Sequence, residues 1–314
     1  MIEFLGLDRS SEVKSVLESY LVTLEEGRKP PPSFINQVLN AWENQQIEIY
    51  AKLDTDNQIL GIAVLGLISN RISIICIAKA ANALDEGQIE AIQTDLFATG
   101  FNRLKTTGEW VLTNDALEGS LREYAMELGF RGFERAFMQI TRDELETIDN
   151  PALNNDRSFV PFEGSMKGDI GELIFRGTAG SIDVDVFPEF FSTEEYALKL
   201  VKDTIANRYG EFRSPKDSWV LKKGDILVGV CLITIRGSYG YIPDICIDPN
   251  LRRKGLGRAL LVHALKQLME KHSELEGVHL DVTLENPAKH LYDSLGFKEL
   301  RRYEVLNWLK KWYS

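Results

Sequence analysis

Long hydrophobic runs are missing from this chain of 314 residues. Its longest apolar stretches, residues 59–68 and 226–235, reach only about half of the roughly 20 residues that a membrane-spanning helix needs. The first residues, Met-Ile-Glu-Phe-Leu-Gly-Leu-Asp, lack the basic region and apolar core of a secretory signal. These absences predict no membrane-spanning segment and lead us to expect a cytoplasmic protein.

Cysteine and histidine are scarce, with three residues of the first kind and four of the second. Cys76, Cys231 and Cys246 lie in apolar runs without Cys-x-x-Cys spacing, so we expect reduced core thiols and neither a disulfide nor a zinc site. The histidines lack metal-ligand spacing to a thiol or carboxylate. We therefore expect no metal cofactor.

Basic residues are outnumbered, because 36 Lys and Arg stand against 47 Asp and Glu and leave a net charge of −11. A nucleic acid would meet net repulsion from such a chain. The same field favours the approach of cations. We therefore expect neither nucleic acid nor a membrane as a partner, and we favour a cationic small-molecule or peptide substrate.

The composition that remains is that of a globular protein, with 44% hydrophobic and 26% charged residues. The length suits two domains. Near the midpoint, residues 148–157 hold Pro151 and several asparagines, which disfavour helix and strand alike. We place a boundary there and predict domains at residues 1–150 and 157–314.

The two halves follow the same order of elements. The first half predicts strands over residues 47–53, 58–69 and 71–79, a helix over 86–104, a strand over 109–113, a helix over 117–128 and a strand over 131–141. The second half predicts strands over residues 218–222, 226–236 and 241–248, a helix over 257–271, a strand over 278–284, a helix over 288–295 and a strand over 298–309.

Short matches between the halves support a duplication. Ile75-Cys76-Ile77 recurs as Ile245-Cys246-Ile247, and Leu128-Gly129-Phe130 recurs as Leu295-Gly296-Phe297. Alternating strands and helices predict an α/β class, with two copies of a mixed sheet flanked by helices.

One turn in the second half has the features of a phosphate site. It follows the strand that ends at Asp248-Pro249 and opens a helix with basic residues and glycines: Arg252, Arg253, Lys254, Gly255 and Gly257. Glycines let backbone N–H groups converge in front of the positive end of a helix, and basic side chains add charge for a pyrophosphate. A solvated basic cap is the alternative for this turn taken alone. The spacings of a P-loop and of a dinucleotide fingerprint are missing.

The Arg252-x-x-Gly255-x-Gly257 pattern after Ile-Asp-Pro resembles the acetyl-CoA loop of the GNAT superfamily of N-acetyltransferases. Residues 285–297, Glu-Asn-Pro-Ala-Lys-His-Leu-Tyr-Asp-Ser-Leu-Gly-Phe, resemble the second signature of that superfamily. The resemblance covers about residues 218–309 and is weaker over 47–141. It implies two tandem GNAT-like acyl-CoA N-acyltransferase domains, an arrangement similar to double-GNAT enzymes of the mycothiol synthase type.

The resemblance also implies acetyl-CoA as the co-substrate. By matched position, the backbone of Ile245, Cys246 and Ile247 would pair with the pantetheine arm. The remaining cofactor-binding residues implied in this way are Arg252, Arg253, Lys254, Gly255, Leu256, Gly257, Arg258 and Asn286. The corresponding residues 77–88 of the first half contain one Gly, one Lys and two carboxylates. We therefore expect a degenerate first domain that binds CoA poorly or not at all.

Acetyl transfer to an amine needs a base, because an alkyl amine is only about 0.1% neutral at pH 7. Tyr292 matches the Leu-Tyr of the second signature and is the expected proton donor to the leaving thiolate, with core packing as the alternative. Where relatives carry Glu or His, this chain has Tyr241 and Pro243. Asp244 would point to the other face unless a bulge intervenes.

The resemblance implies Asp281 as the candidate base, because some protein acetyltransferases of the superfamily carry a catalytic Glu close to this position on the same strand. Glu285 and a water relay stay open. We expect acetyl transfer from acetyl-CoA to a primary amine by direct attack in a ternary complex, with the active site in the second domain. A CoA-binding sensor or scaffold without catalysis is the alternative. Substrate choice is expected within residues 169–212, which include a helix over 192–209 and a group of aromatic residues, Phe187, Phe190, Phe191 and Tyr196. These rings also fit a role in stapling the helix to the core.

Overall fold

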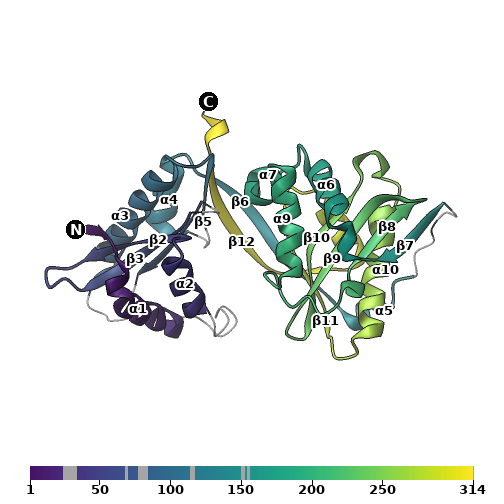
Figure 1. Cartoon of the computed structure of the whole chain (residues 1–314), viewed down its shortest axis with the longest axis horizontal. Helices are drawn as coiled ribbons and strands as arrows, with labels where there is room; N and C mark the ends of the chain where they lie inside the picture. The colour runs from purple at the N-terminus through teal and green to yellow at the C-terminus, as the bar shows by residue number, and fades with distance from the viewer. Residues whose placement is uncertain are drawn as a thin grey trace. The chain divides into compact units, whose positions relative to one another are not determined.

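The computed structural model describes residues 1–23, 34–67, 70–76, 84–113, 117–149, 153 and 156–313. The chain forms two compact units. Unit 1 comprises Met1–Gly132 and Glu304–Ser314, and unit 2 comprises Phe133–Tyr303. Figure 1 labels the elements of both units along the chain.

Unit 1 is a sheet with helices on both faces. Its strands lie in the order β1 (Ile2–Phe4), β2 (Ile47–Leu53), β3 (Ile59–Gly66), β4 (Arg71–Cys76), β5 (Trp110–Thr113) and β12 (Lys298–Leu309). Neighbouring strands are antiparallel except for the parallel pair of β4 and β5. Its helices are α1 (Ser10–Thr23), α2 (Phe34–Glu43), α3 (Glu86–Leu104) and α4 (Gly119–Glu127).

Two apolar clusters hold these layers together. One joins α3 and α4 to the sheet around Phe97, Phe101 and Phe130. The other joins α1 and α2 to the opposite face around Leu17 and Trp42. Figure 1 shows the two helix pairs on opposite sides of the strands.

Unit 2 repeats this topology. Its strands lie in the order β6 (Arg131–Thr141), β11 (Gly277–Thr283), β10 (Tyr239–Ile247), β9 (Ile226–Arg236), β8 (Trp219–Lys223) and β7 (Arg157–Pro161). Again one pair, β10 and β11, is parallel and the others are antiparallel. Its helices are α5 (Arg142–Glu146), α6 (Lys167–Thr178), α7 (Asp183–Val186), α8 (Pro188–Phe191), α9 (Glu194–Ile205), α10 (Leu256–Lys271) and α11 (Ala288–Leu295). The repeated strand order agrees with the predicted duplication and mixed α/β fold.

The closing strand of each sheet comes from the other half of the sequence. β12 pairs with β5 of unit 1, where Asn307 lies opposite Leu112. β6 pairs with β11 of unit 2, where Arg135 lies opposite Thr283. The compact units therefore divide after residues 132 and 303, whereas the polar stretch near residue 150 predicts a single boundary. Local sequence patterns identify a strand but not the sheet that it joins.

Strand β9 separates the two helical layers of unit 2. Cys231 and Ile233 pack in the cluster that contains α10, while Val230 and Leu232 pack in the cluster that contains α6 and α9. This alternation is the period of two expected of a central strand. Cys231 and Cys246 are buried and free, as expected of core thiols, and the side chain of Cys76 lies outside the described residues.

Two negative results apply to the described ranges. No helix there combines the length and apolar composition that crossing a bilayer requires. Nor does that part of the chain contain a group of three or more His, Cys, Asp or Glu residues arranged to hold a metal ion.

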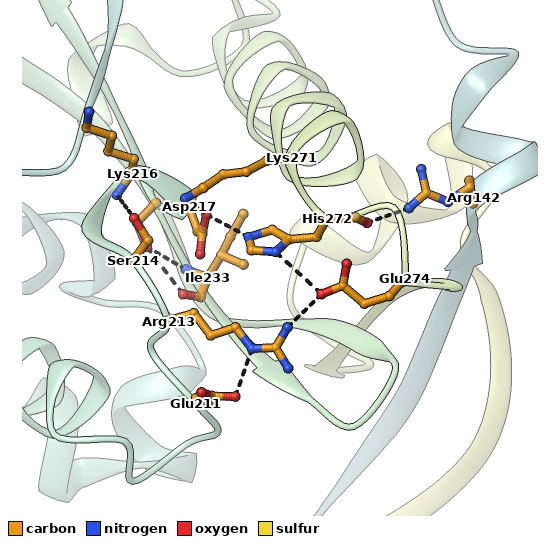
Figure 2. Close-up of polar contacts among 11 residues, drawn as sticks. Arg142, Glu211, Arg213, Ser214, Lys216, Asp217, Ile233, Lys271, His272 and Glu274 are labelled. Carbon is orange, nitrogen blue, oxygen red and sulfur yellow. Dashed lines mark hydrogen bonds and ion pairs between the residues drawn. The ribbon is translucent and has the colours of Figure 1, made fainter.

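Helix α10 is fixed at its C-terminal end. Arg142 donates hydrogen bonds to the carbonyl oxygens of Met269 (3.0 Å), His272 (2.7 Å) and Leu275 (2.9 Å), which satisfies carbonyls at the helix end. Figure 2 shows the Arg142 guanidinium at His272, and the Asp217 carboxylate at the ring of the same histidine. Asp217 is buried and accepts from Lys271 at 2.6 Å and contacts His272 at 3.0 Å. These contacts hold the axis of the helix whose other end forms the candidate site.

Candidate active site

The parallel strands β10 and β11 pair over only part of their length. Residues 239–242 pair with residues 277–280, and no further pairing joins the two described strands, although β10 continues to Ile247 and β11 to Thr283. The register of β10 against β9 shifts between Tyr241 and Asp244, which marks a β-bulge. A bulge bends and twists its strand, so β10 and β11 separate beyond it.

A cavity of about 1020 Å³ opens along this separation. Small-molecule sites commonly measure about 300–1,000 Å³, so the volume suits a large ligand or two ligands together. All residues that line the cavity belong to unit 2. Most come from β10 and β11, from the turn before α10 and its first helical turn, from the start of α11 and from residues 177–191. Single residues of β6, α9 and β12 complete the lining, together with Tyr209 after α9.

Helix α10 directs an open N-terminus at this cavity. Its N-cap residue, Gly255, has φ +76° and offers no side chain to the first-turn N–H groups. The first turn contains no acidic residue. A Cβ atom on Gly255 would meet nothing within 4 Å. First-turn N–H groups have no acceptor within their own helix, so together with the helix dipole they form a site for an anion.

The structure brings almost all the predicted cofactor residues to the cavity. The ones that line it are Ile245, Cys246, Ile247, Arg252, Arg253, Gly255, Leu256, Gly257, Arg258 and Asn286. Lys254 is not among the described lining residues, and its exposed ammonium donates to the carbonyl oxygen of Asn250 at 3.2 Å. Lys254 does not line the cavity in this conformation, and its contact with the coenzyme stays a prediction.

Arg252 is committed to the fold of the turn. Its Nε donates to the carbonyl oxygen of Ile247 at 3.2 Å, and its Nη2 donates to the carbonyl oxygen of Gly177 in α6. The guanidinium thus ties the turn to the neighbouring helix. Arg253 and Arg258 are the other arginines of this region that line the cavity.

Residues 245–247 of β10 pair with β9 on one edge only. Ile245 lies opposite Cys231 and Ile247 opposite Gly229, while no described strand pairs with these residues on the other edge. Free backbone groups on that edge can accept an extended ligand as an added strand. The Cys246 side chain packs toward α6, and burial raises the pKa of its thiol to about 12, so it stays protonated at neutral pH.

The position of Tyr292 is compatible with both expected roles, core packing and proton donation. It lies in α11, is 6% exposed, and packs against Phe297 with ring centroids 5.7 Å apart. It also lines the cavity. Burial, and then the nearby Asp244 carboxylate, raise the pKa of its phenol well above the ordinary value, so the hydroxyl keeps its proton at neutral pH and is available as a hydrogen-bond donor.

Asp281 is held by two tyrosines. It accepts from the hydroxyl of Tyr303 at 2.7 Å and from the hydroxyl of Tyr241 at 3.1 Å, one on each carboxylate oxygen. Burial raises the pKa of Tyr241 to about 12, and the Asp281 charge adds to this rise. Both tyrosines therefore remain donors, and Asp281 orients them at the cavity wall.

Asp244 reaches the cavity because of the bulge in β10. Strict alternation would turn this side chain to the other face, but the extra residue after Tyr241 restores it to the cavity lining. Burial raises the pKa of Asp244 to about 7, and the nearby carboxylate of Asp183 adds to the rise. Its Oδ2 atom is buried and finds no hydrogen-bond partner among the residues that the structure describes. A carboxylate with this pKa can accept a proton near neutral pH.

Asp183 was not singled out from the sequence. It begins α7 and accepts from Nδ2 of Asn286 at 2.5 Å, while Oδ1 of Asn286 accepts from the N–H of Ala288 at 2.8 Å. Burial raises the pKa of Asp183. An Asp in a Ser-Ile-Asp-Val-Asp-Val run carries no local signal of this role, since its position depends on the packing of α7 near β11.

The predicted aromatic group divides. Phe187, Phe190 and Phe191 line the cavity and also pack in the core of α6 and α9, so both expected roles apply to them. Tyr196 is not among the described lining residues. Glu285 lines the cavity beside Asn286. The predicted helix over 192–209 is observed as α9, which Thr193 caps by accepting from the N–H of Tyr196.

Residues 181–297 match the Acetyltransferase (GNAT) family. The chain carries a GNAT acetyltransferase domain. The matched segment includes Asp183, the turn before α10, and both β11 and α11, so the family pattern covers most of the polar wall of the cavity. This match confirms the family that the two motifs indicate.

Curated relatives of this domain are N-acetyltransferases. An N-alpha-acetyltransferase of Sulfurisphaera tokodaii is 40% identical over 63 residues, which make up 20% of this chain and 37% of that protein. The ribosomal protein bS18-alanine N-acetyltransferase of Escherichia coli K12 is 29% identical over 125 residues, 39% of this chain and 81% of that protein. The chain thus spans little more than a third of the first relative and most of the second.

Solved structures resemble the whole chain. A GCN5-related N-acetyltransferase from Sphaerobacter thermophilus has a TM-score of 0.61 at 17% identity and covers 99% of this chain and 95% of its own. A tandem GNAT protein from the clavulanic acid biosynthesis pathway has a TM-score of 0.62 at 12% identity and covers 99% of both chains. At these identities the likeness concerns the fold, and it confirms the tandem GNAT architecture.

Proposed function

We propose that the GNAT domain transfers acetyl from acetyl-CoA to a primary amine by direct attack in a ternary complex. The observation that carries this proposal is the open N-terminus of α10, led by Gly255, beside the free edge of β10. The cavity is large enough for a coenzyme arm and an acceptor together. The named N-acetyltransferase relatives support the same reaction class.

Acetyl-CoA binding follows from these two features. The N–H groups of the first turn of α10, with Arg253 and Arg258, would bind the pyrophosphate. The free edge formed by residues 245–247 would hydrogen-bond the amides of the pantetheine arm. Arg252 would act indirectly, by holding the turn before α10 against Gly177, and would not itself contact the pyrophosphate.

Asp244 is the proposed proton acceptor. The acceptor amine arrives as an ammonium ion and gives one proton to the carboxylate, directly or through water, and its nitrogen then attacks the thioester carbonyl carbon. The carbon–sulfur bond breaks, and the departing thiolate takes a proton from Tyr292. The new amide nitrogen then releases its surplus proton, which returns through water to the Tyr292 oxygen. Asp281, the base expected from the sequence, remains the second candidate, but its two tyrosine partners fit a positioning role better.

The acceptor is proposed to be a small-molecule or peptide amine. The names of two relatives point to α-amino groups of proteins. We infer a cytoplasmic setting, since a reducing compartment suits the free buried thiols of Cys231 and Cys246. The net charge of −11 gives no reason to expect a nucleic acid or an anionic membrane as partner.

Unit 1 is proposed to bind no CoA. At the start of α3, the Asp85 carboxylate accepts from the N–H of Gln88 at 2.8 Å and closes a capping box. The Asp85 carboxylate takes up an N–H group that a phosphate would need, and its negative charge repels a phosphate. The remaining part of the matching stretch, residues 77–83, lies outside the described residues.

A matched pair of substitutions tests the proposal. Gly257 and Gly87 both occupy the second helical position, of α10 and α3 respectively, and a Cβ atom finds ordinary contacts at both. Gly257→Glu should abolish acetyl-CoA binding and acetyl transfer by placing a carboxylate in the anion site, while Gly87→Glu should leave both unchanged. The readouts are calorimetry with acetyl-CoA and thiol release with a panel of amines.

The outcomes separate the two functions. Binding with amine-dependent thiol release supports the transferase. Binding without turnover for any amine would favour the CoA-sensing alternative. Equal binding by the Gly257→Glu variant and the unsubstituted protein would show that the site is wrongly assigned.

A further inference from the structure

Arg135 places a buried positive charge at the wall of the same cavity. It lies on β6 opposite Thr283 of β11 and is 6% exposed. Its guanidinium carbon lies 4.4 Å from the ring centroid of Phe187 and 5.8 Å from that of Tyr303. The two rings fix the plane of the guanidinium group.

Two N–H donor groups of the Arg135 guanidinium have no acceptor among the described residues. Its Nε and Nη1 atoms are buried and have no hydrogen-bond partner there. The nearby carboxylates are engaged elsewhere, Asp281 with two tyrosine hydroxyls and Asp183 with Asn286. Arg135 acts on Asp183 only through its charge, which opposes the rise in the pKa of that carboxyl. A buried cation with unused donors is unfavourable unless an anion completes it.

The surroundings limit the kind of anion. Arg135 contributes a single guanidinium, and the other arginines and the glycines of the cavity belong to the separate region at the start of α10. One guanidinium suits a group with a single negative charge. Asp281 lies at the same wall, joined to the Tyr303 ring that flanks Arg135, and would repel a doubly charged phosphate. A carboxylate matches the planar, directed donors of the guanidinium. Phe187, against which Arg135 stacks, continues into Phe190 and Phe191 at the cavity wall and offers apolar surface next to the charge.

We propose that the acceptor amine carries a carboxylate that binds Arg135, with an apolar side chain against Phe187, Phe190 and Phe191. Its ammonium group would then meet the carboxylates of Asp183 and Asp244. The acceptor class is that of an apolar α-amino acid. This inference rests on the proposed function and departs from the cationic acceptor that the net charge favours, because the charge of the whole chain acts on encounter while Arg135 acts on the bound molecule.

Matched acceptors test this inference. L-phenylalanine and L-phenylalaninamide differ in the carboxylate, and the acetylation kcat/KM of each is measured with the full chain and acetyl-CoA. The readout is the ratio of acid to amide in the unsubstituted protein divided by that ratio in Arg135→Met. Taking this quotient cancels the different basicity of the two amines.

We expect the quotient to be about 10- to 100-fold, the effect of losing a hydrogen bond to a charged group. Arg135→Lys keeps the charge and should recover part of the preference. Far-ultraviolet circular dichroism spectra and acetyl-CoA affinity, which should be unchanged in both variants, show that the fold and the coenzyme site are intact. Where turnover is too slow to measure, the dissociation constants of the two acceptors for the CoA-loaded protein give the same quotient.

A quotient near one in both readouts would overturn the acceptor class. Turnover of the amide or of other amines would meanwhile leave the acetyltransferase proposal standing. Acetyl-CoA binding without turnover of any amine would instead contradict the proposed function. The quotient of dissociation constants would still decide whether Arg135 recognises a carboxylate.

Discussion

The same topology occurs twice in this chain, and the two copies differ where chemistry would take place. The recurring triplets align Asp244 with Ile74 and Tyr292 with Ala125. The helix that follows the fourth strand begins at Gly255 in unit 2 and at Asp85 in unit 1. At each of these three positions, the residue of unit 1 packs in the core or caps a helix. The corresponding residue of unit 2 leaves a carboxylate, a hydroxyl or backbone N–H groups available to a ligand.

The strands differ in the same way. The register between β3 and β4 of unit 1 is continuous, whereas the register between β9 and β10 of unit 2 shifts at the bulge. The bulged strand turns the carboxylate of Asp244 to the cavity of unit 2, where the corresponding position of unit 1 is Ile74. Duplication thus preserved the sheet, which needs only the hydrophobic pattern, while the site depends on a few residues that break that pattern.

Replacing Asp244 should have the largest catalytic effect of the substitutions in this comparison. Asp244→Asn keeps the shape and removes the proposed proton acceptor, so kcat/KM should fall by about 10²- to 10⁴-fold. Acetyl-CoA affinity should not change. Steady-state thiol release measures this, with Asp281→Asn as the matched control. A larger loss in Asp281→Asn than in Asp244→Asn would transfer the role of base to Asp281.

Removing the hydroxyl of Tyr292 should have a smaller effect. Tyr292→Phe keeps the packing against Phe297 and removes the proton donor, so we expect kcat to fall roughly 10-fold, less than for the base because a thiolate is a good leaving group. The thermal midpoint should stay close to that of the unsubstituted protein. An unchanged kcat would leave Tyr292 with packing alone, the role of Ala125 in unit 1.

The titration of Asp244 should contribute to the pH dependence of the unfolding free energy. Because its pKa is about 7 when folded and 3.8 ordinarily, the folded chain keeps a proton that the unfolded chain loses between these values. Stability should therefore fall as pH rises from about 4 to 7, and Asp244→Asn should be more stable above pH 7 by at most about 4 kcal/mol.

Urea unfolding at pH 4 and pH 8 measures the difference. The gain of Asp244→Asn over the unsubstituted protein should be larger at pH 8. A gain that is equal at both pH values would mean that Asp244 is not held in a raised-pKa environment. Ile74, its counterpart in unit 1, carries no titratable group and predicts no such change.

The cap of α3 should matter least, and only for stability. Asp85→Ala removes the acceptor for the N–H of Gln88 and should cost about 1 kcal/mol of unfolding free energy. Acetyl-CoA affinity should not respond. A marked change in affinity would mean that unit 1 takes part in coenzyme binding.

The sequence predicts the strands and helices from residue 47 to 141 and from residue 218 to 309 well, whereas α1, α2, α6, β1 and β7 have no counterpart among the predicted elements. The bounds of β2, α3, β6, β9, α11 and β12 match their predicted ranges, because each has a clear periodicity and clear ends. It predicts neither the exchange of β6 and β12 between sheets nor the short helices α7 and α8, since pairing partners and four-residue helices leave no periodic pattern.

The same contrast holds for the site. Gly255, Gly257 and Tyr292 could be identified because motif spacing is local. Asp183 and Arg135 could not, because they reach the cavity from α7 and β6 through tertiary packing, and Asp244 depends on a bulge that alternation alone does not predict. Lys254, which the motif includes, turns out to lie outside the lining because its ammonium bonds to Asn250.

The number of acetyl-CoA molecules bound per chain tests the central comparison most directly. Isothermal titration calorimetry of the full chain with acetyl-CoA should give a stoichiometry of one, and Gly257→Glu should reduce it to none. A stoichiometry of two in the unsubstituted chain would contradict the account, because unit 1 would then have a coenzyme site of its own. Acetyl-CoA binding that persists in Gly257→Glu would contradict it as well.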